Sequence, residues 1–150
     1  LLEHDPFEPV LIRPDDKDLG LKQAARRAKD LRCDMALCLH ANYSPHPSHH
    51  GCIPFYLPAD PLGKAIAQGI HAHAPLLLMR RAWEATDEQW PRAINVMSPY
   101  VLRGIPVCLP EFGYVSNDED RMYLLSDKGK QACALAAYGG VLAFWEHKER

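Results

Sequence analysis

The residues best suited to chemistry are a histidine and a glutamate that each follow an apolar run. The run from Met35 to Leu39 ends at His40, and the run from Ile105 to Leu109 comes just before Glu111. Such runs are typical of short buried strands, and functional side chains often lie where a strand opens into a loop. Gly, Ser and Asn residues follow Glu111 and predict a turn, so we expect both side chains at strand ends.

A histidine and a glutamate at two strand ends suit a zinc hydrolase. Imidazole is a common zinc ligand, and a carboxylate beside the metal can act as a general base towards water. The two residues form one site only if their strands lie side by side in a sheet. The alternative is that His40 is a hydrogen-bonded structural residue and Glu111 a helix cap or part of a turn. The loop histidines His46, His49 and His50 are either further ligands or exposed surface residues.

The composition excludes some classes of function. The chain has 150 residues, of which 47% are hydrophobic and 24% charged, which predicts one globular domain with a full core. Its net charge of -2 and pI near 6.5 give no basic surface for nucleic acid or an anionic membrane. No apolar run approaches the roughly 20 residues of a membrane span. We therefore expect no nucleic-acid partner and no membrane insertion.

The cysteines predict neither a disulfide framework nor a structural zinc knuckle. They are five in number and include no Cys-x-x-Cys pair. Most lie inside apolar runs, so we interpret them as small buried hydrophobic residues.

Alternating strand-like and helix-like segments predict an α/β fold, with a mostly parallel twisted sheet and helices on both faces. We expect strands at residues 7–12, 35–39, 52–57, 93–97 and 105–109, and helices at 19–31, 61–73, 118–126 and 131–146. The last helix is expected to bury Ala134, Leu135, Tyr138, Val141, Leu142 and Trp145. Asn117 suits a helix N-cap, and Glu119, Asp120 and Arg121 then form the charged first turn.

The sequences around the two candidate residues resemble motifs of a known enzyme family. Residues 39–42, Leu-His-Ala-Asn, resemble its strand-end motif Ser-Ile-His-Ala-Asn, and residues 110–117, Pro-Glu-Phe-Gly-Tyr-Val-Ser-Asn, resemble its motif Val-Glu-Xaa-Gly-Phe-Xaa-Ser-Asn. Residues 10–26 and 51–57 resemble the family's segments in the same order. The family is that of the zinc-dependent N-acetylmuramoyl-L-alanine amidases of the amidase-3 type, and the resemblance covers most of the chain.

The resemblance implies a peptidoglycan hydrolase that cleaves the amide bond between N-acetylmuramic acid and the L-alanine of the stem peptide. In that family two histidines and one glutamate hold a Zn²⁺ ion. His40 matches the last of these ligands, and Glu111 matches the catalytic glutamate, which acts as general base and then general acid. The partner is peptidoglycan, and the enzyme is expected in the periplasm or secreted to the cell wall, as an autolysin, or as a phage endolysin.

The resemblance also implies that residues 1–150 form an amidase-3-like catalytic domain without its first strand and most of its first helix. The family's other two zinc ligands lie in those elements, and neither has a counterpart from Leu1 onward. The chain begins at Leu1 rather than Met and shows no signal peptide, so we expect further sequence upstream. The alternatives are an inactive cell-wall-binding module of the same fold with an incomplete zinc site, and another α/β zinc peptidase.

Overall fold

The computed structural model describes residues 7–15, 19–73, 82–86 and 89–149. Its helices are α1 (Leu21–Asp30), α2 (Pro61–Ala72), α3 (Pro91–Val101), α4 (Asp118–Leu125) and α5 (Asp127–Lys148). Its strands are β1 (Ala36–Leu37), β2 (His40–Asn42), β3 (Ile53–Tyr56), β4 (Trp83–Glu84) and β5 (Val107–Tyr114). The strand expected at 7–12 is wrong, because residues 7–12 are irregular; Pro9 has no amide hydrogen to donate to a ladder.

Strand β5 is the centre of the sheet. On one edge it pairs in parallel with β1 and then β2, and on the other it pairs antiparallel with β3, which in turn pairs in parallel with β4. In the antiparallel pair Pro54 lies opposite Pro110. Neither proline can donate a hydrogen bond, so this position must be a non-hydrogen-bonded pair of the ladder. The sheet is therefore mostly parallel, as expected, with one antiparallel neighbour beside its central strand.

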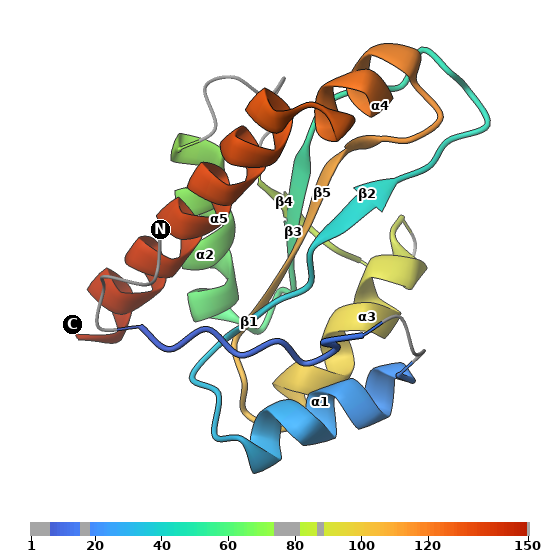
Figure 1. Cartoon of the computed structure of the whole chain (residues 1–150). Helices are drawn as coiled ribbons and strands as arrows, with labels where there is room; N and C mark the ends of the chain where they lie inside the picture. Colours follow the sequence, from blue (N-terminus) through green and yellow to red (C-terminus); the bar gives the residue numbers. More distant parts are fainter. Residues whose placement is uncertain (1–6, 16–18, 74–81, 87–88, 150) are drawn as a thin grey trace.

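Helices cover both faces of the sheet, which confirms the expected α/β architecture (Figure 1). Helices α2 and α5 pack together on one face, and α1 and α3 lie on the other. Each face has its own buried cluster: Phe55, Met97 and Leu109 are in one, and Ile66 and Phe144 are in the other. The central strand thus contributes side chains to both layers of the core.

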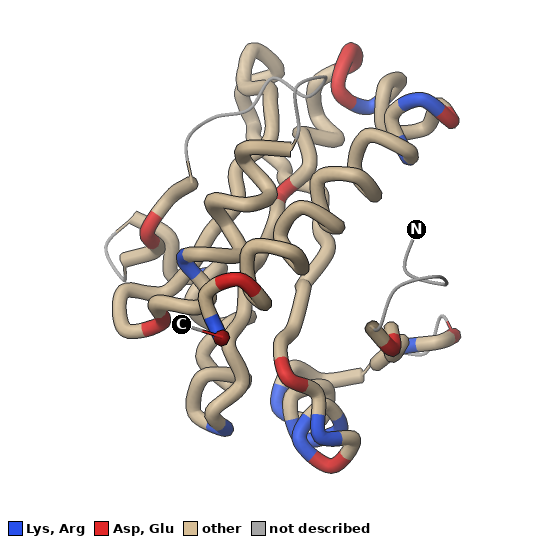
Figure 2. Tube along the Cα trace, turned by 90° about the vertical axis from the view of Figure 1, so that its left-hand side faces the viewer, with Lys and Arg blue, Asp and Glu red and all other residues tan. Residues whose placement is uncertain are grey.

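Helix α1 is amphipathic, as its sequence predicts. Ala25 and Ala28 are buried. Its outer side and the following turn carry exposed cations, and Figure 2 shows the resulting cluster of blue: Lys22, Arg26, Arg27, Lys29 and Arg32. Small inward residues let α1 approach α3 closely, while the charged residues remain in solvent.

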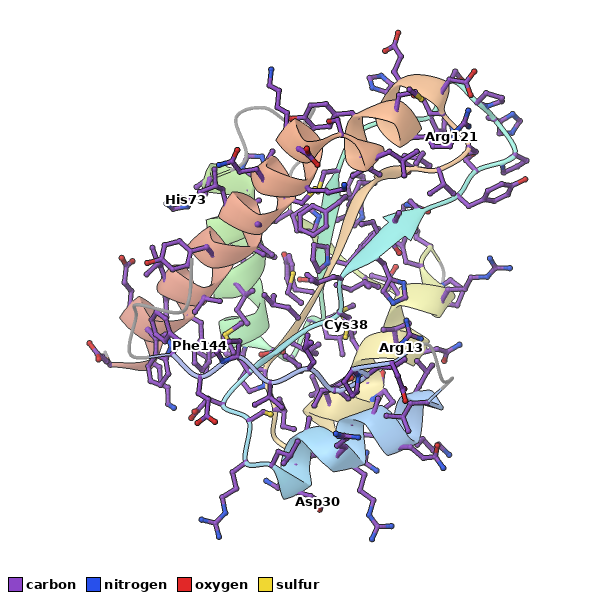
Figure 3. All side chains as sticks on the ribbon, in the orientation of Figure 1. Arg13, Asp30, Cys38, His73, Arg121 and Phe144 are labelled. Carbon is purple, nitrogen blue, oxygen red and sulfur yellow. The ribbon has the colours of Figure 1, made fainter. Side chains whose placement is uncertain are left out.

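Helix α5 buries a different side from the one expected. Its buried residues are Gly129, Ala132, Ala136, Gly139, Gly140 and Phe144, whereas Leu135 is 41% exposed. The reason is close packing against α2, where a Cβ added to Gly69 would lie 2.5 Å from the carbonyl oxygen of Gly139. His73, labelled in Figure 3, lies at the end of α2 against Gly139. Helices at this separation need small residues at the contact, so Gly139 and Gly140 face α2, and Leu135, on another side of α5, is left exposed.

The segment 93–97, expected as a strand, is part of helix α3. Pro91 occupies the first turn of this helix, where its missing amide hydrogen costs nothing. Ala93, Met97 and Tyr100 are buried at helical spacing. A short apolar run is compatible with either structure, and here the packing of α3 on α1 and β5 favours the helix.

A buried aspartate fixes the start of β5. Asp60, only 6% exposed, is the N-cap of α2 and accepts a hydrogen bond from the amide of Gly63 at 2.7 Å through Oδ1. Its other oxygen, Oδ2, accepts from the amide of Val107 at 2.8 Å. One carboxylate thus joins the beginning of a helix to the beginning of the central strand.

Candidate active site

The structure brings His40 and Glu111 together. They are register partners in the parallel pair of β2 and β5, so the condition set by the sequence, that their strands be adjacent, is met. Both were expected at strand ends, and that detail is wrong. His40 opens β2, and β5 continues past Glu111 to Tyr114, because β2 pairs with it on one side and β3 on the other.

A β-bulge lies immediately after Glu111. His40 pairs with Glu111 and Asn42 pairs with Tyr114, so two steps along β2 correspond to three along β5. Within the bulge Gly113 has φ = 141°, a conformation that residues with a side chain rarely adopt. Bulges bend a strand and redirect its side chains, and they are frequent beside active sites.

Glu111 has an unsatisfied carboxyl group. Its Oε2 atom is buried and has no hydrogen-bond partner among the described residues. Because burial disfavours the charged form, the pKa of Glu111 is raised to about 7. A carboxyl group with a pKa near neutrality can both take up and release a proton under working conditions, which is what a general base and acid requires.

His40 is exposed, and its surroundings disfavour the charged form of its imidazole. Partial desolvation lowers its pKa, and the nearby charge of Arg13 lowers it further. Arg13 is labelled in Figure 3 on the extended segment that precedes α1. Neutral imidazole is the form that binds a metal, so this environment favours ligation. Arg13 and His40 are 27 positions apart in the chain, so only the folded structure shows that the charge of Arg13 acts on His40.

A pocket of about 440 Å³ opens beside His40, between β2 and the helices α4 and α5. It is lined mainly by apolar side chains: Leu39, His40, Ala41, Phe112, Leu124, Lys130, Cys133, Ala134 and Ala137. Cys133 is one of the five cysteines, all of which are free thiols; Cys52 and Cys108 are buried as expected, whereas Cys33, Cys38 and Cys133 are partly exposed. Burial raises the pKa of the Cys133 thiol to about 11, so this cysteine is neutral in the pocket.

The loop histidines do not assemble a metal site. Ser44 Oγ lies 2.9 Å from His49 Nδ1, and the rings of His46 and His49 are 5.5 Å apart between centroids. Among the described residues, no three His, Cys, Asp or Glu side chains are grouped so that they could hold a metal ion. The contacts of Ser44 and His49 instead order the loop that joins β2 to β3.

The capping role expected for Asn117 is confirmed. Its side-chain oxygen accepts from the amide of Asp120 at 3.0 Å, and its Nδ2 donates to the carbonyl of Pro47 at 2.7 Å. Asn117 therefore starts α4 and also ties this helix to the loop after β2.

In this α/β sandwich the central strand places a half-buried glutamate in register with a histidine of the neighbouring strand, an arrangement that suits a hydrolase. The family model for N-acetylmuramoyl-L-alanine amidase matches residues 1–143, and the chain belongs to this family. It is accordingly an enzyme, a hydrolase of the amide bond between N-acetylmuramic acid and L-alanine in peptidoglycan. The alternative of an inactive wall-binding module is not favoured.

Solved amidase structures share the fold. The catalytic domain of CwlV from Bacillus (Paenibacillus) polymyxa var. colistinus has a TM-score of 0.80 and 25% identity, over 97% of this chain and 76% of that chain. AmiC2 of Nostoc punctiforme has a TM-score of 0.70 and 23% identity, over 91% of this chain and 72% of that chain. The CwlD amidase of Clostridioides difficile, solved with the GerS lipoprotein, has a TM-score of 0.71 and 18% identity, over 91% of this chain and 75% of that chain. No curated protein matches the chain.

No described helix combines the length and the apolar character that a membrane span requires.

The raised pKa of Glu111 predicts a pH-dependent stability. Between pH 4.5 and 7 the unfolded chain releases this proton while the metal-free folded protein retains it, so folding becomes less favourable as pH rises. Glu111→Gln removes the ionisation. In EDTA, the variant should match the parent near pH 4 and exceed its free energy of unfolding by about 1–3 kcal/mol at pH 8, measured by urea denaturation. A difference that does not change with pH would contradict the buried, partnerless carboxyl group.

Proposed function

We propose that residues 1–150 form the greater part of a zinc-dependent amidase domain, in which His40 is a zinc ligand and Glu111 the general base and acid. The observation that supports this most directly is the register pairing of His40 with Glu111, whose Oε2 atom is buried and has no hydrogen-bond partner in the described part of the chain. The chain covers 76% of the CwlV catalytic domain, which supports the proposal that residues 1–150 make up most of a domain of this kind.

The chemistry of the residues present fits a zinc ion. Zinc favours neutral imidazole, and the lowered pKa of His40 provides it. The buried Oε2 atom of Glu111 is an acceptor with no partner among the described residues, so it is free to bind the water that a zinc site would hold. A catalytic zinc normally has three protein ligands, and the described residues contain no group of three. We therefore assign His40 as one ligand and place the other two, a histidine and a glutamate in the family, outside the described residues.

The proposed mechanism assigns proton transfer to Glu111. When bound, zinc supplies a Lewis acid that polarises the scissile carbonyl and makes water more acidic. Glu111 takes a proton from the attacking water, and the new C–O bond forms as the amide carbonyl becomes tetrahedral. Glu111 then gives this proton to the amide nitrogen and the C–N bond breaks. The stem peptide leaves with a free amino group on its L-alanine.

The substrate determines where the enzyme works. Peptidoglycan lies outside the cytoplasmic membrane, so we propose action at the cell wall, by an autolysin of the periplasm or cell surface or by a phage endolysin. The apolar pocket of about 440 Å³ beside His40 is the place that we assign to part of the muramyl peptide.

Metal analysis and product analysis of the full-length protein test this proposal together. His40→Ala should lower bound zinc from near stoichiometric to below a tenth and abolish the release of stem peptides from purified peptidoglycan. His71→Ala is the matched control, because His71 is an exposed histidine at the end of α2, remote in sequence from the motif, and should change neither. Mass spectrometry should find intact muramic acid and peptides that begin with alanine. Full zinc content in the His40 variant, or cleavage at another bond, would refute the assignment.

A further inference from the structure

One carboxylate oxygen of Asp120 holds two segments beside the candidate site. Asp120 was expected to be an exposed charge in the first turn of α4, but it is partly buried and its side chain turns back towards the sheet. Its Oδ2 atom accepts from the amide of Tyr114 at 2.8 Å and from the amide of Gly51 at 2.8 Å. Figure 3 labels the next residue, Arg121, at the end of α4 that meets β5 and the loop after β2.

The amides of Tyr114 and Gly51 belong to β5, which contains Glu111, and to the segment that leads into its neighbour β3. Tyr114 is the last residue of β5 and closes the bulge that begins after Glu111. Gly51 precedes β3 by two residues, and the first residue of β3, Ile53, is the register partner of Glu111 on the other side. The two hydrogen bonds to Asp120 thus tie the end of β5, just after Glu111, to the segment that leads into the neighbouring strand β3.

The bulge is shaped to receive Asp120. A Cβ added to Gly113 would lie 3.2 Å from Asp120 Oδ2 and 3.3 Å from its Cγ, so a larger residue would push the carboxylate away. The φ of 141° at Gly113 independently favours glycine. Meanwhile Asn117 caps the amide of Asp120, which sets the orientation of the helical turn that carries the carboxylate. Three local features therefore act together on one contact.

We propose that Asp120 is a positioning residue for Glu111, since it holds the end of the β-bulge that follows Glu111 and so sets the course of the strand that carries Glu111 beside His40. The proposal rests on the catalytic role proposed for Glu111. Hydrogen bonds between a carboxylate and backbone amides are among the stronger ones in proteins, so the bulge has a rigid end. A rigid bulge matters for the position of the Glu111 carboxyl group, because a displacement of about 1 Å in a catalytic group can lower the rate on the order of 100-fold.

A purely structural role for Asp120 makes a different prediction, and Asp60 provides the comparison. Asp60 also accepts from two amides, at 2.7 and 2.8 Å, and one of these belongs to β5, but at the end of the strand away from Glu111. Loss of a contact at Asp60 should lower stability without changing the rate of the folded enzyme. Loss of the contacts at Asp120 should lower both.

The experiment compares variants of the full-length zinc-loaded enzyme at a temperature where circular dichroism shows each to be folded. Asp120→Ala should lower kcat about 10- to 100-fold with KM within about twofold of the parent. Asp120→Asn should stay within about threefold, because a single amide oxygen in the place of Oδ2 can still accept both hydrogen bonds. Asp60→Asn should be less stable yet keep the parental kcat. If Asp120→Ala does not fold, Gly113→Ala displaces the carboxylate from the opposite side and should show the same loss of kcat.

A double-variant cycle shows whether Asp120 acts through Glu111. In a Glu111→Gln background, the change Asp120→Ala should lower kcat by less than about twofold, because the group being positioned is already absent. An equal loss of kcat in both backgrounds, or a kcat for Asp120→Ala equal to that of Asp60→Asn, would overturn the positioning role. If Glu111→Gln by itself retains activity, the proposed function fails instead, so the two failures are distinguishable.

Discussion

Glu111→Gln should lower kcat for release of stem peptides on the order of 10³-fold or more, the upper range for loss of general acid and base catalysis. Glutamine has nearly the same shape but neither accepts nor releases the proton that must pass from water to the leaving amine. The buried Oε2 atom and the pKa of about 7 make Glu111 the described side chain best suited to that transfer. Zinc content should stay near that of the parent, because Glu111 is assigned to proton transfer and not to ligation.

Glu119→Gln is the matched control for this change. Glu119 is an exposed carboxylate in the first turn of α4, and the same substitution there should leave kcat within about twofold. Initial rates on soluble muropeptides, at saturating substrate and with zinc content measured for each preparation, provide the comparison. If the Glu111 variant kept more than a tenth of the parental kcat, the proton must be carried by another group.

Asp60→Ala should lower the free energy of unfolding by about 3–4 kcal/mol, the largest loss of stability that we expect from a single hydrogen-bonding side chain. The change leaves the amides of Gly63 and Val107 without acceptors inside the core and removes the N-cap of α2. Each buried unsatisfied amide costs about 1–3 kcal/mol, and loss of a cap costs about 1 kcal/mol.

Urea denaturation at pH 7 measures the effect of the Asp60 change, with Asp127→Ala as its control. Asp127 is an exposed carboxylate at the start of α5 whose ion pair with Lys130, at 3.3 Å, is also exposed. Such pairs contribute little, so the control should lose no more than about 0.5 kcal/mol. A loss below about 1 kcal/mol for Asp60→Ala would mean that water or another acceptor replaces the carboxylate.

Elements with local signals were predicted well. Helix α2 begins at Pro61 as expected, and α4 begins after Asn117, its expected N-cap; the capping role of Asp60 in α2 was not predicted. These signals act through hydrogen bonds within four residues of the helix start, so a single sequence contains them. The motif residues His40 and Glu111 were also identified from their neighbours, before any pairing of strands was known.

Elements without local signals were predicted poorly. The run from Ala93 to Met97 is compatible with a strand or a helix, and only its packing against α1 and β5 decides for the helix. For α5 the helical periodicity was predicted correctly but the buried side was wrong. The side that faces inward depends on the close contact between Gly139 of α5 and Gly69 of α2. Strand β5 was placed too early, since its extent is set by its partners on both edges.

The sequence by itself determined the two motifs, the family that they imply and the helices that begin at clear caps, because each depends on neighbouring residues. Tertiary structure decided that His40 and Glu111 share a register position, that Oε2 of Glu111 is buried with no partner among the residues described, and that the pKa of Glu111 rises to about 7. It also decided that Asp120, expected only as part of the charged first turn of α4, accepts hydrogen bonds from the amides of Tyr114 and Gly51. These properties arise from groups that are far apart in the chain, so they exist only once the strands and α4 have packed together.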